Sequence, residues 1–536
     1  MLNWIRSFRG PARVDAAQLL QQAESAYGEG AAERARELCL WALKQAPRED
    51  ARALSLLAAI AADAGLTEEG LRWARRAQAA DPGSASPHYV AGRLWQDAGR
   101  LPEAEASYRS AVALQPAHAR AHNNLGCVLH MQGKLEAALD AYRRALDLDS
   151  SLPQANQNYA SIVRDTGALQ RAAEDYLRHT QANPNDALAF NDLGNTLREL
   201  GRHDEALAAY GRALALNPGL AEAHFSRSFV QLLQGNYAAG WKEYEWRWRI
   251  PAFNAPARRF AQPIWDGGAL AGGTVLLHAE QGLGDTLQFV RYAPLVAQRC
   301  AQVVLECQPE LKDLMRGVAG VQRVIAQGEL LPAFGAHAPL LSLPGIFGTT
   351  LDSVPWNGPY VHADAGRRAT WREAIASNGS RLMVGLVWAG RPQQWDDRKR
   401  SISLAMLAPL AGAGRVTFIS LQKGAAAAEA GAPPAGMKLI DLSARIADFS
   451  DTAALASLLD LVITIDTSVA HLAGAMGLPV WVLTAHAPDW RYHLGRDDNP
   501  WYPSMRLIRQ ERDGDWSGAI GRAAESLRRR AAQAGD

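Results

Sequence analysis

Residues 122–149 have the sequence HNNLGCVLHMQGKLEAALDAYRRALDLD, and this stretch decides how the first half of the chain folds. Apolar side chains recur every three to four residues over 121–132 and again over 135–148, which is the spacing of helices with one buried face. Gly133 separates the two runs, and glycine commonly ends a helix because it adopts a left-handed backbone without strain. We therefore predict two amphipathic helices joined by a short turn.

The same pattern recurs along the chain with a period of 34 residues. The glycines expected to end the first helix of each unit are Gly65, Gly99, Gly133, Gly167, Gly201 and Gly235. Tyrosines keep the same spacing at Tyr108, Tyr142, Tyr176, Tyr210 and Tyr244. A unit of this length with two helices and small residues at their crossing resembles the tetratricopeptide repeat. We expect six units over 51–254 and a degenerate one over 17–50, which together make an α solenoid over 17–254.

Repeat solenoids present a concave groove that commonly holds peptides or protein surfaces. The asparagines that we place in this groove are Asn123, Asn124, Asn158, Asn191 and Asn195. Each amide both donates and accepts hydrogen bonds, so these side chains could grip the backbone of a protein acceptor. The alternatives are that they are solvated polar positions or that they bond between repeats. The last unit ends in an aromatic run, in which Trp241, Trp246 and Trp248 are predicted to cap the solenoid and dock it on the next domain. An aromatic platform for a ligand is the alternative.

The second half of the chain has a different pattern. After a linker at 255–272 that is rich in Pro, Gly and Ala, short apolar runs alternate with helical stretches. The runs expected to form buried strands lie at 274–280, 301–307, 337–341, 382–388, 415–421, 438–442, 461–466 and 479–483. Strands that alternate with helices indicate parallel sheets. We predict two α/β domains, at 273–375 and 380–536, with ligands bound at the carboxyl ends of their strands.

The turn EQGLGD at 280–285 follows the first of these strands and opens a helix. Gly282 and Gly284 allow a ligand to approach the backbone closely, and the amides of a helix N-terminus attract an anion. The turn lacks the third glycine of a dinucleotide fingerprint, which argues against an NAD site. Asp285 either takes a proton from an acceptor hydroxyl or caps the helix.

Two further strand ends carry polar groups suited to a phosphorylated sugar. In DTSVAH at 466–471, Asp466 is placed to accept hydrogen bonds from sugar hydroxyls, and Thr467 and Ser468 stand at a helix tip that suits a diphosphate. His471, one turn further on, is either a ligand contact or a satisfied structural histidine. The basic run DRKRS, which contains Lys399 and Arg400, also follows a strand. It either neutralises a pyrophosphate leaving group or forms a solvated loop.

One strand later, Gln422 and Lys423 repeat this placement, and we expect them to contact the donor phosphate as well. The stretches that surround these residues are HAEQGLGDTLQFVRY, GLVWAG, DRKRSISL, SLQKG, DFSDTAALASLLDLVITIDTSVAHLAGAMGLPVWVL and PDWRYHL. Together they resemble bacterial tetratricopeptide-repeat glycosyltransferases whose catalytic part is similar to the heptosyltransferases, in the manner of glycosyltransferase family 9. The resemblance implies a GT-B fold of two facing Rossmann-like domains and a metal-independent, inverting reaction with a nucleotide sugar and no cofactor.

By this resemblance, Asp285 matches the family's catalytic base, and Asp466, Thr467, Ser468 and His471 match its donor site. The region of the family's phosphate-binding lysine here holds Lys399 and Arg400. Ser468 stands where heptosyltransferases usually have glycine, and its side chain would intrude on the donor. We therefore expect a nucleotide sugar other than ADP-heptose.

Composition excludes several other functions. The chain of 536 residues has 56 basic and 55 acidic side chains, so it is not a general partner of nucleic acids. No apolar run approaches the ~18–20 residues of a membrane span, and the start, MLNWIRSFRGPARVD, lacks the apolar core of a secretory signal. The four cysteines fit neither a zinc site nor a disulfide framework. We expect a cytoplasmic protein with no bound metal.

The leading hypothesis is therefore a glycosyltransferase that acts on a Ser or Thr hydroxyl of a protein held by the repeats. It is similar to systems that glycosylate flagellin and adhesins, which implies that the enzyme meets its acceptor before export. One alternative is a repeat scaffold with an inactive transferase domain. Another is a transferase that acts on lipopolysaccharide or another glycan and uses its repeats for assembly.

Overall fold

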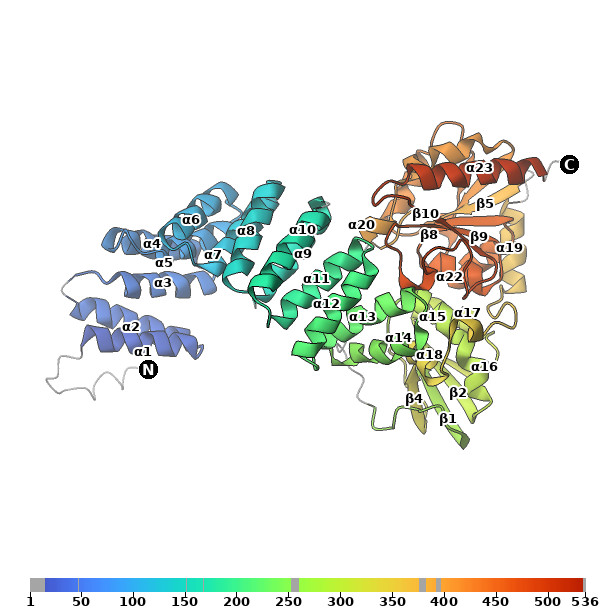
Figure 1. Ribbon diagram of the computed structural model, residues 1–536, viewed down its shortest axis with the longest axis horizontal. Coiled ribbons are helices and arrows are strands. Elements are labelled where there is room, and N and C mark those ends of the chain that lie inside the picture. Colours follow the sequence, from blue (N-terminus) through green and yellow to red (C-terminus); the bar gives the residue numbers. More distant parts are fainter. Residues whose placement is uncertain are drawn as a thin grey trace. The chain divides into compact units, whose positions relative to one another are not determined.

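The structure is a computed structural model that describes residues 15–46, 48–150, 152–166, 168–251, 260–375, 382–391 and 397–533 (Figure 1). Gly167 of the repeat pattern lies outside these residues, as do the N-terminal stretch and the first part of the predicted linker. The chain separates into two compact units between Asp192 and Leu193.

Paired helices joined by short turns fill the first unit, as the period of the sequence predicts. They are α1 (Ala16–Gly28), α2 (Ala32–Gln45), α3 (Ala51–Asp63), α4 (Thr67–Ala80), α5 (Ser86–Asp97), α6 (Leu101–Leu114), α7 (Ala119–Met131), α8 (Leu135–Leu148), α9 (Pro153–Thr166) and α10 (Leu169–Ala182). Helix α11 (Ala187–Glu199) carries the boundary between the units. Helices α12 (His203–Leu216), α13 (Ala221–Leu233) and α14 (Tyr237–Tyr244) belong to the second unit. The last helices of the repeat region therefore share a compact unit with the α/β region.

Glycine is required at two places in the helical pairs. The turn glycines Gly65, Gly99, Gly133, Gly201 and Gly235 have φ between 71° and 84°, a left-handed backbone that other residues rarely adopt. A second set lets the paired helices cross closely. A Cβ at Gly126 would lie 2.6 Å from the ring of Tyr142, and Gly92 and Gly194 face Tyr108 and Tyr210 in the same way. The period in the sequence is therefore the period of these crossings.

Two parallel sheets form the core of the α/β region (Figure 1). The first has the order β3 (Arg323–Ala326), β2 (Cys300–Cys307), β1 (Leu270–His278), β4 (Ala336–Pro339). The second has the order β10 (Met505–Arg509), β9 (Val480–Thr484), β8 (Leu461–Ile465), β5 (Leu382–Leu386), β6 (Val416–Ser420), β7 (Leu439–Asp441). Within the described ranges, neighbouring strands of both sheets pair in parallel. The prediction of parallel sheets is thereby confirmed.

Two of these strands were not expected from the sequence. Strand β3 has only four residues and begins with an exposed arginine, so its apolar run is too short to stand out. Strand β10 has arginines at its second and last positions, which interrupt the apolar run that a buried strand shows. Both lie at the edge of a sheet, where one side of the strand has no neighbour and polar residues are tolerated.

Helices cover the two sheets. They are α15 (Leu283–Phe289), α16 (Ala293–Ala297), α17 (Lys312–Met315), α18 (Leu343–Ile346), α19 (Ala365–Ile375), α20 (Asp397–Arg400), α21 (Phe449–Ala456), α22 (Ser468–Ala475) and α23 (Ser517–Gln533). Across the described ranges, no helix is long and apolar enough to cross a membrane.

An aromatic cluster joins α14 to the α/β region, and we call it the seam cluster; it consists of Tyr237, Trp241, Trp490 and Trp501. All four side chains are at most 4% exposed. The indole of Trp241 meets that of Trp490 edge to face at 5.3 Å between ring centroids. The indole N–H of Trp501 donates to the Tyr237 hydroxyl at 2.9 Å. Trp241 thus docks the end of the repeats on the α/β region, as predicted.

Replacement of Trp241 by alanine tests the seam cluster. The side chain is 4% exposed, and its indole N–H donates to the backbone carbonyl of Thr349 at 3.0 Å. Truncation of a buried tryptophan leaves a cavity and costs about 3–5 kcal/mol. We expect Trp241→Ala to lower the free energy of unfolding by this amount in denaturant titrations. Leu330, which is 93% exposed, provides the control, because Leu330→Ala should change stability by less than ~0.5 kcal/mol. Equal effects of the two substitutions would contradict the account.

Candidate functional site

A pocket of about 790 Å³, partly open to solvent, lies at the carboxyl ends of β8 and β9. Asp466 follows β8 directly, and Thr484 is the last residue of β9. The segment after β9 lines the pocket as far as Tyr492. Parallel α/β sheets bind their ligands at this edge, because the strands end there and the loops diverge. We therefore take this pocket as the candidate site.

Helices of the last repeats line the same pocket. Their contributions are Arg198 and Glu199 from the end of α11, His203 from the start of α12, and Phe229 and Leu233 from α13. Helix α13 also contacts the short 3-10 helix at Trp490–Tyr492, which carries part of the seam cluster. The candidate site therefore belongs to the repeats as well as to the second sheet.

The predicted cations Lys399 and Arg400 lie in this pocket next to carboxylates. The ammonium nitrogen of Lys399 is 2.8 Å from a carboxylate oxygen of Glu199. A guanidinium nitrogen of Arg400 is 3.8 Å from the carboxylate of Asp466. Both cations keep less than a third of their side chains exposed, so they are parts of a built site and not of a freely solvated loop.

Asp466 is the member of the predicted donor motif that lines the pocket. The hydroxyl of Tyr492 donates to its carboxylate at 2.6 Å. Thr467 precedes α22 with its hydroxyl 3.0 Å from that of Thr464. Ser468 begins α22 and is half-buried. Neither Thr467 nor Ser468 is among the residues that line the pocket.

His471 is buried between the two sheets' helices. Its Nδ1 is 3.0 Å from the Tyr502 hydroxyl, and a Cβ at Gly284 would lie 2.7 Å from its ring. Burial lowers the pKa of His471 to about 3, and the nearby Arg491 acts in the same direction. These contacts are those of a neutral structural histidine that packs α22 against the GLGD turn, and its donor-binding role stays a prediction.

Asp285 has partners on both carboxylate oxygens. One oxygen accepts the backbone N–H of Gly282 at 2.8 Å, as a helix cap does. The other accepts from the guanidinium of Arg491 at 2.5 Å. Burial raises the pKa of Asp285, while the positive charge of Arg491 acts in the opposite direction. Gly282 thus holds the predicted base by its amide, and Gly284 permits the close packing on α22.

Gln422 and Lys423 are engaged with backbone groups of the second sheet. The side-chain oxygen of Gln422 accepts the N–H groups of Trp388 and Ala389, both at 2.9 Å. The ammonium of Lys423 donates to the carbonyl oxygens of Ser443 and Ile446, both at 2.8 Å. These contacts fix the loops after β5 and β7, and neither side chain lines the pocket. Their predicted contact with phosphate remains untested.

The predicted groove asparagines bond mainly within the repeats. Asn158 donates to Asn123 at 3.0 Å, and Asn123 donates to Asn124 at 3.1 Å. Asn195 accepts from the hydroxyl of Tyr210 at 2.9 Å. Asn191 donates to the neighbouring Asp192 at 3.4 Å. The hydrogen bonds from α9 to α7 match the interpretation that these side chains bond between repeats, and capture of an acceptor by these amides stays a prediction.

Sequence reasoning did not single out three residues that contact the predicted site: Arg491, Tyr492 and Arg247. Arg491 binds Asp285, and the next residue, Tyr492, binds Asp466. Arg247, at the end of the repeats, forms a buried ion pair with Glu280 of the EQGLGD turn at 2.9 Å. The stretch PDWRYHL contains Arg491 and Tyr492 and was part of the family resemblance, but a linear motif does not show which carboxylates its side chains reach.

Comparison with known proteins identifies the repeats. A family model described as tetratricopeptide repeat matches residues 89–153, and a model described as TPR repeat matches residues 194–235. The chain therefore contains tetratricopeptide repeats, which serve as scaffolds for protein interaction. This confirms the interpretation of the period.

One curated relative is Protein FlbA of Caulobacter vibrioides, which is 28% identical over 340 residues. The match covers 58% of this chain and 55% of the relative, so the chain spans about half the length of the curated relative. Among solved structures, YrrB, described as a TPR protein with an unusual peptide-binding site, is 22% identical, with 35% of this chain and 96% of that chain covered and a TM-score of 0.26. PilF of Pseudomonas aeruginosa is 21% identical, with 39% and 94% covered and a TM-score of 0.30.

Stability should depend on pH through two buried histidines. Burial lowers the pKa of His471 to about 3 and that of His493 to about 4. The unfolded chain, with histidine pKa near ~6.5, binds more protons below that pH, so the free energy of unfolding should fall as pH decreases from about 6.5 to 4. The expected slope is at most ~1.4 kcal/mol per pH unit for each histidine.

Denaturant titrations between pH 7 and 4.5 measure this slope. The variant His493→Asn should make it shallower, and asparagine tolerates the positive φ of 50° at this position. The control is His486→Asn, because His486 is exposed. If His493→Asn leaves the slope of unfolding free energy against pH unchanged, His493 is not held neutral in the folded protein.

Proposed function

We propose that this protein is a glycosyltransferase that moves a sugar from a nucleotide-sugar donor to a Ser or Thr hydroxyl of a protein acceptor. One observation carries the proposal: the consecutive residues Arg491 and Tyr492 hold Asp285 and Asp466, the predicted base and the predicted donor contact. The likeness of the surrounding motifs to heptosyltransferases supports this reaction class and a GT-B arrangement of the two sheets.

The donor would bind in the pocket at the ends of β8 and β9. Asp466 would accept hydrogen bonds from sugar hydroxyls. Arg400, which lies 3.8 Å from Asp466, and Lys399, which lines the same pocket, would neutralise the diphosphate. Fixed cations in a half-buried pocket stabilise a leaving diphosphate more strongly than cations in water do. The amides at the start of α22 would add a partial positive charge at the same strand end.

Asp285 would act as the base. Burial raises its pKa, which makes the carboxylate a better proton acceptor. In the proposed step, the acceptor hydroxyl replaces Arg491 as the partner of one Asp285 oxygen, and Arg491 keeps its ion pair with Asp489 at 2.9 Å. The hydroxyl oxygen forms the new bond to the sugar, the bond from sugar to diphosphate breaks, and the hydroxyl proton passes to Asp285.

The variant Asp285→Asn tests the base. Because Arg491 retains Asp489 as a partner, the fold should survive the loss of the charge on Asp285. We expect the transfer rate to fall by about 10²–10⁴-fold, as for a lost general base, with donor affinity nearly unchanged. A thermal-shift screen with UDP-, GDP-, ADP- and CMP-sugars first identifies the donor, since a tightly bound ligand raises the melting temperature. Transfer of radiolabelled sugar from that donor then gives the rate.

The control is Asp352→Asn, which removes an exposed carboxylate from the same unit and should leave transfer unchanged. Loss of donor binding in Asp285→Asn would make Asp285 a structural cap instead of a base. Absence of any bound nucleotide sugar in the wild type would favour the scaffold with an inactive transferase domain.

Removal of the first repeats tests the role of the solenoid. A chain that begins at residue 185 is cut between α10 and α11 and keeps the whole of the second compact unit. We expect it to melt cooperatively and to hydrolyse the donor, but to lose at least tenfold in transfer to protein acceptors in an extract of the source cells. Labelled protein bands on gels provide the measurement.

A chain that begins at residue 255 is the matched comparison. It lacks Tyr237 and Trp241 of the seam cluster, and we expect it to fail to fold, because Trp490 and Trp501 lose their packing partners. Full transfer to protein by the chain that begins at residue 185 would rule out acceptor capture by the first repeats. Transfer to isolated lipopolysaccharide but not to protein would favour the glycan transferase.

A further inference from the structure

The pocket at the ends of β8 and β9 has a wall made by the repeats, and two residues of that wall carry unused hydrogen-bonding groups. We infer that Arg198 and His203 bind the diphosphate of the nucleotide-sugar donor, so that the last repeats are part of the donor site. This inference rests on the proposed function and extends it. It predicts that the repeats contribute to donor binding as well as to acceptor binding.

The first support is a concentration of buried polar atoms without protein partners. Among the described residues, several pocket-lining side chains other than that of Arg400 have such an atom, and most of these atoms are hydrogen-bond donors or hydroxyls. They are Arg198 Nε, His203 Nδ1, Thr484 Oγ1 and Trp490 Nε1. Buried polar atoms of native proteins almost always have a partner, and donor groups that converge on one pocket match a ligand rich in acceptor oxygens, as a diphosphate is.

The second support is the way in which the charged side chains of the pocket are paired. Lys399 is paired with Glu199, and Arg400 lies next to both Asp397 and Asp466. Asp489 is paired with Arg491. Within the described ranges, Arg198 forms no ion pair with a carboxylate. Its guanidinium can therefore pair with a bound anion, and charge-assisted hydrogen bonds of guanidinium to phosphate are among the strongest in proteins.

The third support is that these groups are held in place. The guanidinium of Arg198 lies 5.7 Å from the centroid of the Phe229 ring, and Phe229 itself lines the pocket. Burial lowers the pKa of His203, and the charge of Arg198 acts in the same direction. A neutral imidazole keeps one N–H and one acceptor nitrogen. His203 can thus donate to a phosphate oxygen without adding a further positive charge to the wall.

The test is isothermal titration of the full chain with UDP, GDP, ADP, CDP and inorganic pyrophosphate. We expect Arg198→Gln to weaken binding of the preferred nucleoside diphosphate and of pyrophosphate by at least tenfold. Arg198→Lys keeps the charge but loses the planar fork, so it should restore part of the affinity. The matched control is Arg202→Gln, which removes one positive charge from an exposed arginine that is paired with Glu205.

The outcomes separate the two proposals. Wild-type affinity in Arg198→Gln, with a nucleotide still bound, overturns the inference and leaves the proposed function standing. Binding of pyrophosphate but of no nucleotide overturns the proposed function as stated, and a loss of pyrophosphate binding in Arg198→Gln then still supports the anion site. Binding of neither probe by the wild type overturns both. Equal losses in Arg198→Gln and Arg202→Gln indicate general electrostatics and also overturn the inference. Melting curves without ligand show whether each variant is folded.

Discussion

The packing of Trp241 and Tyr237 against Trp490 and Trp501 is the interaction on which the rest of the second unit depends. These rings come from the last repeat helix and from the segment after β9. Large aromatic side chains bury much apolar surface each, and this cluster ties α14 to the α/β core. Without this cluster, the last repeats and the carboxyl ends of β8 and β9 would not line one pocket.

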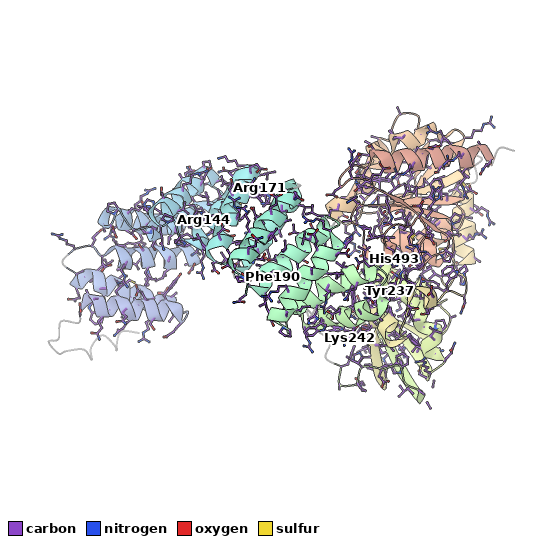
Figure 2. The ribbon with its side chains drawn as sticks, in the orientation of Figure 1. Arg144, Arg171, Phe190, Tyr237, Lys242 and His493 are labelled. Carbon is purple, nitrogen blue, oxygen red and sulfur yellow. The ribbon has the colours of Figure 1, made fainter. Side chains whose placement is uncertain are left out.

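That apolar packing holds the polar groups of the candidate site in position. Trp490 is buried in the seam cluster. This position places the next two residues, Arg491 and Tyr492, in contact with Asp285 and Asp466. Figure 2 shows Tyr237 and His493 side by side, and the Tyr237 hydroxyl is 2.9 Å from a ring nitrogen of His493. The burial of Trp490 at one end of this segment and the hydrogen bond of His493 at the other leave the segment little freedom. A short stretch of chain therefore connects the end of the repeats, the first sheet and the second sheet.

Much of the fold could be predicted because its causes are local. A glycine that ends a helix, such as Gly133, and a glycine that meets a tyrosine ring, such as Gly126, each show themselves in the sequence at a fixed spacing. Buried parallel strands appear as apolar runs, and the two that were missed lie at sheet edges where that requirement is relaxed. The candidate site was less predictable. Sequence motifs pointed to Asp285, Asp466, Lys399 and Arg400, but not to which partner each side chain meets.

The sequence by itself determined the repeats, the parallel sheets and the strand ends at which polar residues gather, because each depends on spacing within a few tens of residues. Tertiary structure alone decided that Gln422 and Lys423 bond to backbone carbonyls and amides, that His471 is buried against Gly284, and that Arg198 and His203 line the same pocket as Asp466. These contacts join residues far apart in the chain. Their positions depend on how helices and sheets pack, and no local pattern records that packing.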